Sequence, residues 1–263
     1  MRAIITGAAS GIGRATAFRL ARDSVLRDQE PASLLLVDIS KGGLAEAASL
    51  LRAEGALADI YVGDLCDPSV AAAVVDAADR AFGGLDALIS NAGAIMRSSL
   101  LELSTADYER SFALNTRATW LLAKAAHPLL ALSRGCVVAT ASISAHEPTP
   151  PLGAYSASKA ALIMLVRQMA LEWGPAGIRC NTVSPGSTHT GMTDARYADP
   201  AQRMAAAQRN PLRTVGSPEN QAAAIAFLVG PDAAYITGID LLVDGGLCTM
   251  LMPASGFGDP WSR

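Results

Sequence analysis

The segment GAYSASKAAL holds a tyrosine and a lysine four residues apart, Tyr155 and Lys159. In a helix, two side chains at this spacing lie on one face. A phenol has a pKa of about 10 and is a poor base at neutral pH. An ammonium group about 4 Å away, at an effective dielectric of about 20, favours the phenolate by up to about 4 kcal/mol, or roughly three pKa units. The pair is therefore a candidate acid–base centre, although the same spacing also arises by chance in helices with no chemical role.

A serine hydroxyl precedes this pair. The apolar segment Cys136–Ala141 is typical of a buried strand, and it ends at Ser142, thirteen residues before Tyr155. A hydroxyl at this place could hold the substrate oxygen with which a tyrosine exchanges a proton. Ser144 is the alternative in the sequence ATASIS, and the spacing to Tyr155 favours Ser142.

The sequence TGAASGIG, residues 6–13, joins an apolar run to a helix-forming segment. Gly7 would permit a tight turn, Gly11 would let the backbone approach a pyrophosphate, and Gly13 would let helix and strand pack closely. The first N–H groups of the helix would then face the negative charge. This order predicts a dinucleotide site, although the spacing is G-x-x-x-G-x-G and an isolated glycine turn can also be purely structural.

An acidic residue, Asp38, ends the second apolar run, LLLVDIS. At this place a carboxylate can accept hydrogen bonds from the adenosine ribose hydroxyls and repel a 2′-phosphate. The repulsion at about 4 Å is between roughly 1 and 4 kcal/mol, which favours NAD over NADP about fivefold to a thousandfold. Arg14 and Lys41 are the nearest basic residues that could weaken this preference. The alternative is an ordinary strand-end aspartate that faces solvent.

These groups need a scaffold, and the hydrophobic pattern supplies one. Short apolar runs alternate with longer alanine-rich segments of helical spacing, as in a parallel sheet buried on both faces. The predicted strands are Ala3–Thr6, Leu34–Asp38, Ala58–Val62, Ala87–Ser90, Cys136–Ala141, Arg179–Val183 and Ile239–Val243. The predicted helices are Gly13–Ala21, Leu44–Glu54, Val70–Ala81, Thr105–Leu132, Tyr155–Glu172 and Pro218–Leu228. With no linker or repeat, residues 1–263 are expected to form a single Rossmann-like α/β domain, a doubly wound seven-stranded parallel sheet.

Local signals refine this scaffold. Ser69, Ser104 and Ser217 stand where N-cap residues are expected. The polar segment Arg22–Ser33 predicts a long surface loop, and Pro185–Asn210, rich in Thr and Met, predicts a mobile substrate lid.

Composition excludes several other classes of protein. Lys plus Arg number 21 against 24 Asp plus Glu, so the basic excess that nucleic-acid binding needs is missing. The four cysteines form no C-x-x-C pair, so we expect no metal site and free thiols in a reducing compartment. The start MRAIITGAASG does not resemble an export signal, and charged residues interrupt the most apolar helix, Ala157–Trp173. We therefore expect a cytoplasmic protein without a membrane span.

Taken together, these motifs resemble those of the short-chain dehydrogenase/reductase family over residues 6 to about 246. They are the glycine turn, Asn91-Ala92-Gly93, Asn115, Ser142, Tyr155, Lys159 and Pro185-Gly186. The resemblance implies hydride transfer between a nicotinamide cofactor and a secondary alcohol or ketone, with Tyr155 as acid or base. Lys159 would bind the nicotinamide ribose and lower the pKa of the tyrosine, Ser142 would orient the substrate, and Asn115 would position a water.

The same resemblance implies a set of residues that bind the cofactor. They are Gly7, Ser10, Gly11, Ile12, Gly13, Asp38, Asp64, Leu65, Asn91, Ala92, Gly93, Tyr155, Lys159, Pro185, Gly186, Thr188 and Thr190. Asp64 would meet the adenine amino group, and Pro185 to Thr190 would cover the nicotinamide. The chain departs from the family pattern at Ser90, where an asparagine is usual, which should affect packing at the strand end more than chemistry.

Residues that follow the predicted strand ends are expected to form the substrate pocket. They are Ile95, Met96, Ser144, His146, Pro150, Leu152, His189, Met192 and Tyr197. Arg97, His146 and His189 could recognise a carboxylate or polar group, or could be ordinary loop residues. The segments SAHEP and SPGSTHTGM resemble those of family members that aromatise a cyclic dihydrodiol. A dihydrodiol is therefore the second candidate substrate beside a generic secondary alcohol.

A non-catalytic NAD-binding sensor is the rival of a different class, since a fold alone does not establish activity. The set of Ser142, Tyr155 and Lys159 argues against a sensor, which has no need of an activated phenol. The resemblance further implies a homotetramer. The apolar tail, residues 247–263, is expected to pack on a neighbouring subunit.

Overall fold

A seven-stranded parallel sheet forms the centre of the computed structural model, which describes residues 1–26 and 30–250. The strands are β1 (Arg2–Thr6), β2 (Ser33–Asp38), β3 (Leu57–Val62), β4 (Ala87–Ser90), β5 (Cys136–Thr140), β6 (Arg179–Pro185) and β7 (Asp240–Val243). Their order is β3-β2-β1-β4-β5-β6-β7, and every pair of neighbours is parallel. The predicted doubly wound α/β fold is confirmed.

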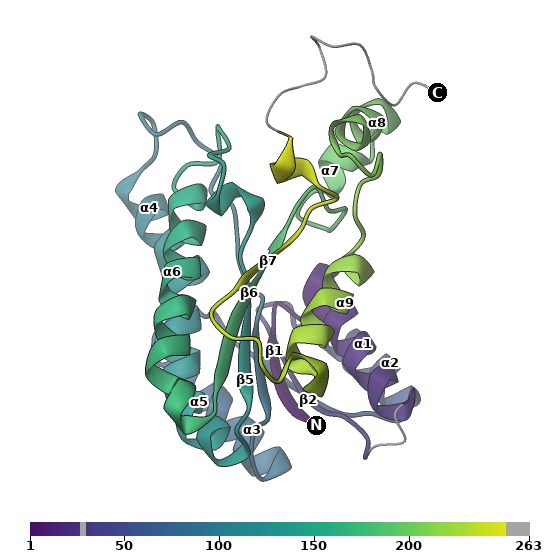
Figure 1. Ribbon diagram of the computed structural model, residues 1–263, viewed down its shortest axis with the longest axis vertical. Coiled ribbons are helices and arrows are strands. Elements are labelled where there is room, and N and C mark those ends of the chain that lie inside the picture. The colour runs from purple at the N-terminus through teal and green to yellow at the C-terminus, as the bar shows by residue number, and fades with distance from the viewer. Residues whose placement is uncertain (27–29, 251–263) are drawn as a thin grey trace.

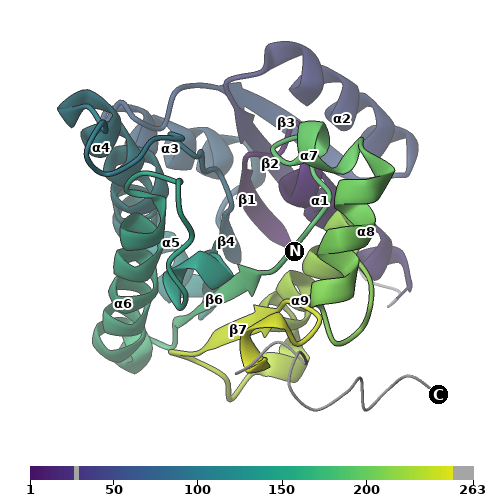
Figure 2. The same ribbon diagram turned by 90° about the horizontal axis from the view of Figure 1, so that it is seen from above.

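Helices cover both faces of this sheet (Figures 1 and 2). They are α1 (Gly11–Leu26), α2 (Lys41–Ala53), α3 (Val70–Phe82), α4 (Thr105–Phe112), α5 (Ala118–Ser133), α6 (Tyr155–Trp173), α7 (Asp194–Tyr197), α8 (Pro200–Arg209) and α9 (Pro218–Val229). One core joins the sheet to α1, α2 and α9, and a second joins it to α3, α5 and α6. Neighbouring strand residues alternate between the two cores, Ile5 in the first and Ile4 in the second.

Burial differs between the middle and the edges of the sheet. The central strands β4 and β5 are buried along their whole length. The outer strand β3 is not, because Leu57 is 59% exposed and Val62 is 45% exposed. The expectation that helices bury both faces of every strand is therefore correct only for the inner strands, since an edge strand has a neighbour on one side alone.

Helix α1 is longer than predicted. It continues to Leu26, so the first five residues of the predicted loop Arg22–Ser33 are helical. Ser104 caps α4 as expected, because its hydroxyl accepts the N–H of Asp107 at 3.1 Å. Ser69 does not cap α3: its hydroxyl donates to the Asp67 carboxylate, which also accepts its N–H. At Ser217 the N–H donates to the Asn220 side chain at 2.8 Å, which closes the first turn of α9.

The predicted helix Thr105–Leu132 is not continuous. A π-helical segment, Ala113–Arg117, separates α4 from α5. Hydrophobic spacing did not reveal it, because a single π-helical turn of five residues is too short to establish a period of its own. The segment predicted to form a substrate lid, Pro185–Asn210, contains the helices α7 and α8.

None of the helices described is long and apolar enough to cross a membrane. Within residues 1–26 and 30–250, no group of His, Cys, Asp and Glu side chains is placed to hold a metal ion. The tail begins with a short 3-10 turn, Leu247–Thr249. Residues 251–263, on which most of the expected role of the tail depends, lie outside the described residues.

Candidate active site

The motif residues gather at the carboxyl edge of the sheet. The chain leaves β1 toward α1 on one face and leaves β4 toward the other face, so the winding reverses between these two neighbouring strands. Ligands of open α/β sheets bind at such a reversal. In Figure 1, α4 stands on one side above this edge, and α7 and α8 stand on the other.

The glycine turn is tightly packed, as a pyrophosphate site requires. Gly7 and Gly11 have positive φ angles of 66° and 54°, which side chains other than glycine rarely adopt. A Cβ at Gly13 would collide with the carbonyl oxygen of Gly7, and one at Gly11 would lie 3.5 Å from Thr190. Because α1 begins at Gly11, its first free N–H groups open at this cradle. The turn therefore fits a dinucleotide, and neighbouring Ser10 is exposed and Ile12 half-buried beside it.

Asn91 connects three strand ends around this cradle. Its side-chain amide donates to the carbonyl of Thr6 at 3.2 Å, and its oxygen accepts the hydroxyl of Thr140 at 3.0 Å. The hydroxyl of Thr6 accepts the N–H groups of Asn91 and Ala92, each at 2.9 Å. β1, β4 and β5 are thus held together where the site opens. Ser90 stands where the family usually has an asparagine, and its hydroxyl forms a hydrogen bond with Thr119 at 2.7 Å inside the protein. The serine is therefore accommodated by the packing of the strand end.

Two carboxylates lie further along the cofactor side. Asp38 accepts the N–H groups of Ala9 at 3.2 Å and Ser40 at 3.0 Å, which connects the end of β2 to the glycine turn. Asp64 accepts the N–H of Cys66 and lies 3.7 Å from the guanidinium of Arg110. Leu65 beside it is buried. The carboxylates of Asp38 and Asp64 thus lie at the carboxyl edge of the sheet, as predicted from the sequence.

Ser142 and Tyr155 meet across the site. Both are buried, and the Ser142 hydroxyl lies close enough to the phenol to act on its pKa. The Ser142 oxygen accepts the N–H of Ser144 at 3.1 Å, which leaves its hydrogen free to be donated. Ser144 instead pairs with Thr149 at 3.0 Å. Of the two serines, Ser142 is the one in contact with the phenol.

The pKa of Tyr155 moves in the direction opposite to the expected one. Burial raises it, because the phenolate would lose its hydration, and the hydrogen bond from Ser142 opposes that rise. The ammonium of Lys159 lies 5.9 Å from the centre of the ring. The expected lowering by Lys159 is therefore wrong for the chain by itself, because desolvation is the largest effect.

Lys159 is itself buried, at 3% exposure, and burial lowers its pKa to about 8. Its ammonium donates to the carbonyl of Thr140 at 2.7 Å. A Cβ at Gly93 would lie 3.3 Å from this ammonium and 3.0 Å from the oxygen of Asn115. The absence of a side chain at Gly93 therefore lets Lys159 and Asn115 pack closely against the backbone there.

Asn115 lies in the π-helical segment and is 1% exposed. Its side chain bonds both the N–H and the carbonyl of Ala94, each at 3.0 Å, and donates to Ser158 at 3.1 Å. It thus connects the chain after β4 to α6, which carries Tyr155 and Lys159. The expectation that Asn115 positions a water molecule stays a prediction.

The segment that follows β6 turns over the site. Gly186 packs against Asp244 so closely that a Cβ there would collide with it, and Thr188 pairs with Gly216 in an isolated bridge. The buried side chain of Gln221 on α9 donates to the hydroxyl of Thr188 at 3.1 Å and to the carbonyl of Val243 at 2.9 Å. The base of the predicted lid is therefore anchored, and motion of the lid stays a prediction.

The predicted substrate pocket has a varied wall. Ser144 and Tyr197 are buried, Met192 is 50% exposed, His146 is exposed, and Ile95, Met96, Leu152 and His189 are half-buried. Both histidines are paired with carboxylates: His146 with Asp240 at 2.6 Å and His189 with Asp194 at 2.9 Å. They are thus less free to recognise an anionic substrate than expected, and of the three candidates only Arg97 has no ion-pair partner in the described parts of the chain.

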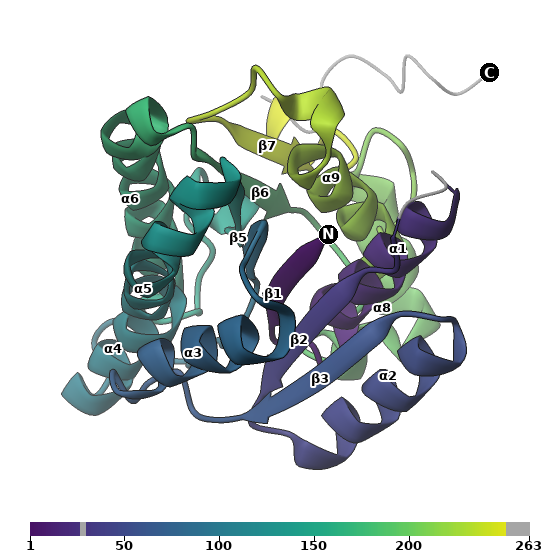
Figure 3. The same cartoon turned by 90° about the horizontal axis from the view of Figure 1, so that it is seen from below.

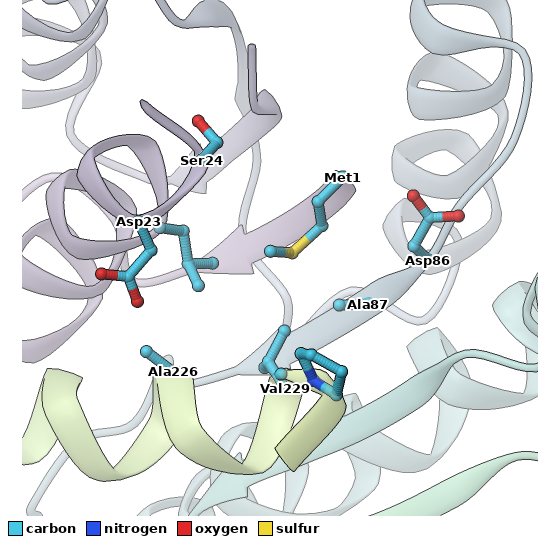
Figure 4. Close-up of a pocket in the computed structure, with 10 residues that line it drawn as sticks. Met1, Asp23, Ser24, Asp86, Ala87, Ala226 and Val229 are labelled. Carbon is cyan, nitrogen blue, oxygen red and sulfur yellow. The ribbon is translucent and has the colours of Figure 1, made fainter. Parts of the chain in front are cut away.

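A separate cavity of about 270 Å3 lies at the opposite, amino edge of the sheet, between α1, α9 and the starts of β1 and β4 (Figure 4). Figure 3 shows these four elements from below. Its carboxylates are already used, since Asp86 pairs with Arg2 and Asp23 with Arg19. This cavity is far from Tyr155 and does not belong to the candidate active site.

Several residues of the site had no signal in the sequence. Thr6, Thr140, Ser158 and Gln221 hold the motif residues, and Asp240 pairs with His146. They are small polar residues at strand ends or inside helices. Only the contacts they make distinguish them from others of their type.

Known proteins resemble this chain along nearly its whole length. A family model described as enoyl-(acyl carrier protein) reductase matches residues 7–248. 2-(S)-hydroxypropyl-CoM dehydrogenase 3 of Xanthobacter autotrophicus is 34% identical over 251 residues, 92% of this chain and 94% of that protein. 2,3-dihydro-2,3-dihydroxybenzoate dehydrogenase of Bacillus subtilis is 32% identical over 253 residues, 93% of this chain and 94% of that protein. The crystal structure of a putative NAD(P) dependent gluconate 5-dehydrogenase from Beutenbergia cavernae, with bound NADP, has a TM-score of 0.85 at 32% identity, covering 94% of this chain and 96% of that one.

Proposed function

Because this chain belongs to the short-chain dehydrogenase/reductase family, we propose that Tyr155 exchanges the proton when the chain oxidises a secondary alcohol or reduces a ketone. The chain is an oxidoreductase that acts on alcohols with a nicotinamide cofactor. The convergence of the buried Ser142 hydroxyl and Tyr155 phenol, beside the buried Lys159, is the observation that carries the proposal.

Each residue has a separate task in this proposal. The nicotinamide, when bound, accepts or donates the hydride. Ser142 donates its free hydrogen to the substrate oxygen and so holds that oxygen beside the Tyr155 hydroxyl, which takes or gives the proton. The ammonium of Lys159, held by the carbonyl of Thr140, keeps a positive charge beside the phenolate that forms. Gly7, Gly11 and Gly13 would hold the pyrophosphate at the start of α1.

The test removes only the phenol oxygen. Tyr155→Phe should lower kcat about 10²- to 10⁴-fold, because the proton loses its acceptor, while cofactor binding persists. Turnover is followed by reduced nicotinamide absorbance, and binding by calorimetry. The control is Tyr235→Phe, the same change at a fully exposed tyrosine. Near wild-type turnover in Tyr155→Phe would overturn this mechanism.

We also propose that NAD is preferred over NADP. The Asp38 carboxylate stands at the end of β2, and the nearby Arg14 is paired with Glu46 at 2.7 Å and so less free to bind a phosphate. Asp38→Ser should raise the ratio of kcat/KM for NADP over NAD by about fivefold or more, because a Coulomb repulsion of roughly 1 kcal/mol or more is removed. Asp59→Ser on β3 changes net charge equally and should leave the ratio unchanged. Tighter binding of NADP by the wild type would contradict the assignment.

A cyclic dihydrodiol is the second candidate substrate. The similarity to 2,3-dihydro-2,3-dihydroxybenzoate dehydrogenase favours it, while the pairing of His146 and His189 with carboxylates leaves Arg97 as the basic candidate for a substrate carboxylate. One screen of NAD reduction across cyclic diols, sugar alcohols, hydroxysteroids and 3-hydroxyacyl thioesters separates the candidates. A non-catalytic sensor would reduce NAD with none of them.

We further propose a cytoplasmic homotetramer. The four cysteines are all free, which suits a reducing compartment. Large apolar side chains on the outer surfaces of α5 and α6 suit contacts between subunits.

A further inference from the structure

The turn that carries Ser142 ends in a histidine. Ser142 precedes a 3-10 turn, Ile143–Ala145, and His146 closes it with its N–H on the carbonyl of Ile143 at 2.9 Å. Inside the turn, the N–H of Ala145 bonds the carbonyl of Ser142 at 2.9 Å. Residues 142–146 thus form one compact unit that joins the catalytic hydroxyl to the imidazole.

The imidazole is fixed to a buried carboxylate. Asp240 begins β7, and its side chain is 2% exposed. One of its oxygens accepts the hydroxyls of Thr182 at 2.6 Å and Ser184 at 2.9 Å, and the other lies 2.6 Å from Nε2 of His146. A buried carboxylate is costly unless donors surround it, so this carboxylate strongly favours the contact with His146.

The turn is therefore held at both ends. Before Ser142, the N–H of Ala141 bonds the carbonyl of Val183 on β6 at 2.7 Å, and after it His146 reaches β7. We propose that His146 is a positioning residue: its bond to Asp240 sets the place of the Ser142 hydroxyl relative to Tyr155. This inference rests on the proposed function, in which Ser142 orients the substrate oxygen.

Other titratable groups lie near His146 and Asp240, but none of them takes the place of His146 as the partner of the Asp240 carboxylate. Glu147 and Asp244 are close enough to Asp240 to act with it on the thiol of Cys248, and burial together with these carboxylates raises the pKa of that thiol to about 11. Both oxygens of Asp244 accept N–H groups, of Gly246 at 2.9 Å and of Cys248 at 2.7 Å. His146 is thus the basic partner of Asp240 among the described residues.

Three substitutions at one position test the proposal. His146→Ala and His146→Asn should lower kcat tenfold to a hundredfold, because a catalytic group displaced by about 1 Å loses about that much rate. Glutamine places an amide N–H where Nε2 lies, so His146→Gln should stay within threefold of the wild type. The dissociation constant of the cofactor should be the same in all four proteins, and His127→Gln on α5 is the matched histidine control.

The pH profile separates positioning from mere stabilisation. Tyr155 faces Ser142 and Lys159, and its bond with Ser142 lowers its pKa against the effect of burial. Loss of the contact with Ser142 should therefore move the ascending limb of the kcat/KM profile for alcohol oxidation, along which Tyr155 becomes the base, to higher pH in His146→Asn, but not in His146→Gln.

The outcomes are distinct. If His146→Ala or His146→Asn keeps the kcat and the pH profile of the wild type, the inference is wrong. The proposed function as an oxidoreductase is not affected by that result. A loss of kcat with an unmoved profile, and no recovery in His146→Gln, would also overturn the inference. If His146→Ala does not fold, the comparison of His146→Asn with His146→Gln decides alone. If the wild-type protein has no activity with any of the alcohols, the proposed function is contradicted instead.

Discussion

Lys159 carries its charge where water reaches it poorly. The side chain has one hydrogen bond to a neutral carbonyl, that of Thr140, and burial lowers its pKa from 10.5 to about 8. In the unfolded chain the same amine holds its proton more firmly. Lys159, to which we assign a role in the chemistry, therefore weakens the fold at neutral pH, as catalytic groups often do.

The sign of the pH effect follows from these two pKa values. Below about pH 8 both states are protonated, and the buried charge costs about 3 kcal/mol of stability, because burial lowers the pKa from 10.5 to about 8. Between about pH 8 and pH 10.5 the folded state has released the proton and the unfolded state has not, so the cost falls as pH rises.

Lys159→Met should therefore be more stable than the wild type at pH 7, without cofactor, by about 1–2 kcal/mol, because the lost bond to Thr140 offsets part of the gain. Urea denaturation at pH 7 and pH 10 measures the difference, which should shrink at the higher pH. Lys124→Met, an exposed lysine on α5, is the control and should show little change. A variant less stable than the wild type at pH 7 would contradict this account of Lys159.

At the scale of an element, the π-helical segment Ala113–Arg117 does what a regular helix could not. The extra residue turns Asn115 inward, where its amide bonds Ala94 and Ser158. Thr116 adds a bond from its hydroxyl to the carbonyl of Ser158 at 2.8 Å. α6, which presents Tyr155 and Lys159, is thereby fixed to the loop after β4.

Asn115→Ala should lower the free energy of unfolding by about 2–4 kcal/mol, because it leaves buried donors and acceptors unpaired. It should also lower kcat, since α6 loses its tie to the cofactor side. Asn181→Ala is the matched control: Asn181 is fully buried and bonds the backbone of Ile236 and Ile239, away from the site. We expect it to lose similar stability in urea while kcat at low temperature is kept. Equal effects of both variants on kcat would count against a special role for the π-helical segment.

At the scale of the whole molecule, apolar side chains remain uncovered on the helices of one face. Trp120 on α5 is 41% exposed, and Met164 and Leu171 on α6 are 61% and 81% exposed. Met164 and Leu171 are seven residues apart and so share one side of α6. Figure 2 shows α5 and α6 on the same side of the molecule, away from α1 and α9. Such a surface is suited to contact with another subunit.

The pair of substitutions Met164→Glu and Leu171→Glu should reduce the mass of the assembly in light scattering after gel filtration, because buried charges would separate the subunits. Leu50→Glu on α2 places the same charge on a half-exposed leucine of the other face and should not change the mass. An unchanged assembly in the double variant would place the interface elsewhere.

The sequence by itself determined the fold class and the motif residues. Seven apolar runs became seven parallel strands, because each run was bounded by glycine, proline or polar residues and was too short for a helix. The glycine turn could be interpreted because residues other than glycine rarely adopt the positive φ of Gly7 and Gly11. Tyr155 and Lys159 could be paired because four residues make about one helical turn.

Only the tertiary structure decided what surrounds these residues. Burial is a property of the packed chain, so the rise in the pKa of Tyr155 and the lowered pKa of Lys159 could not be derived from spacing. The break in the predicted helix at Ala113–Arg117 depends on packing against segments far away in the sequence. The pairing of His146 with Asp240 likewise joins two distant segments. Local pattern specifies elements, whereas contacts between distant elements set the electrostatics of a site and the orientation of its groups.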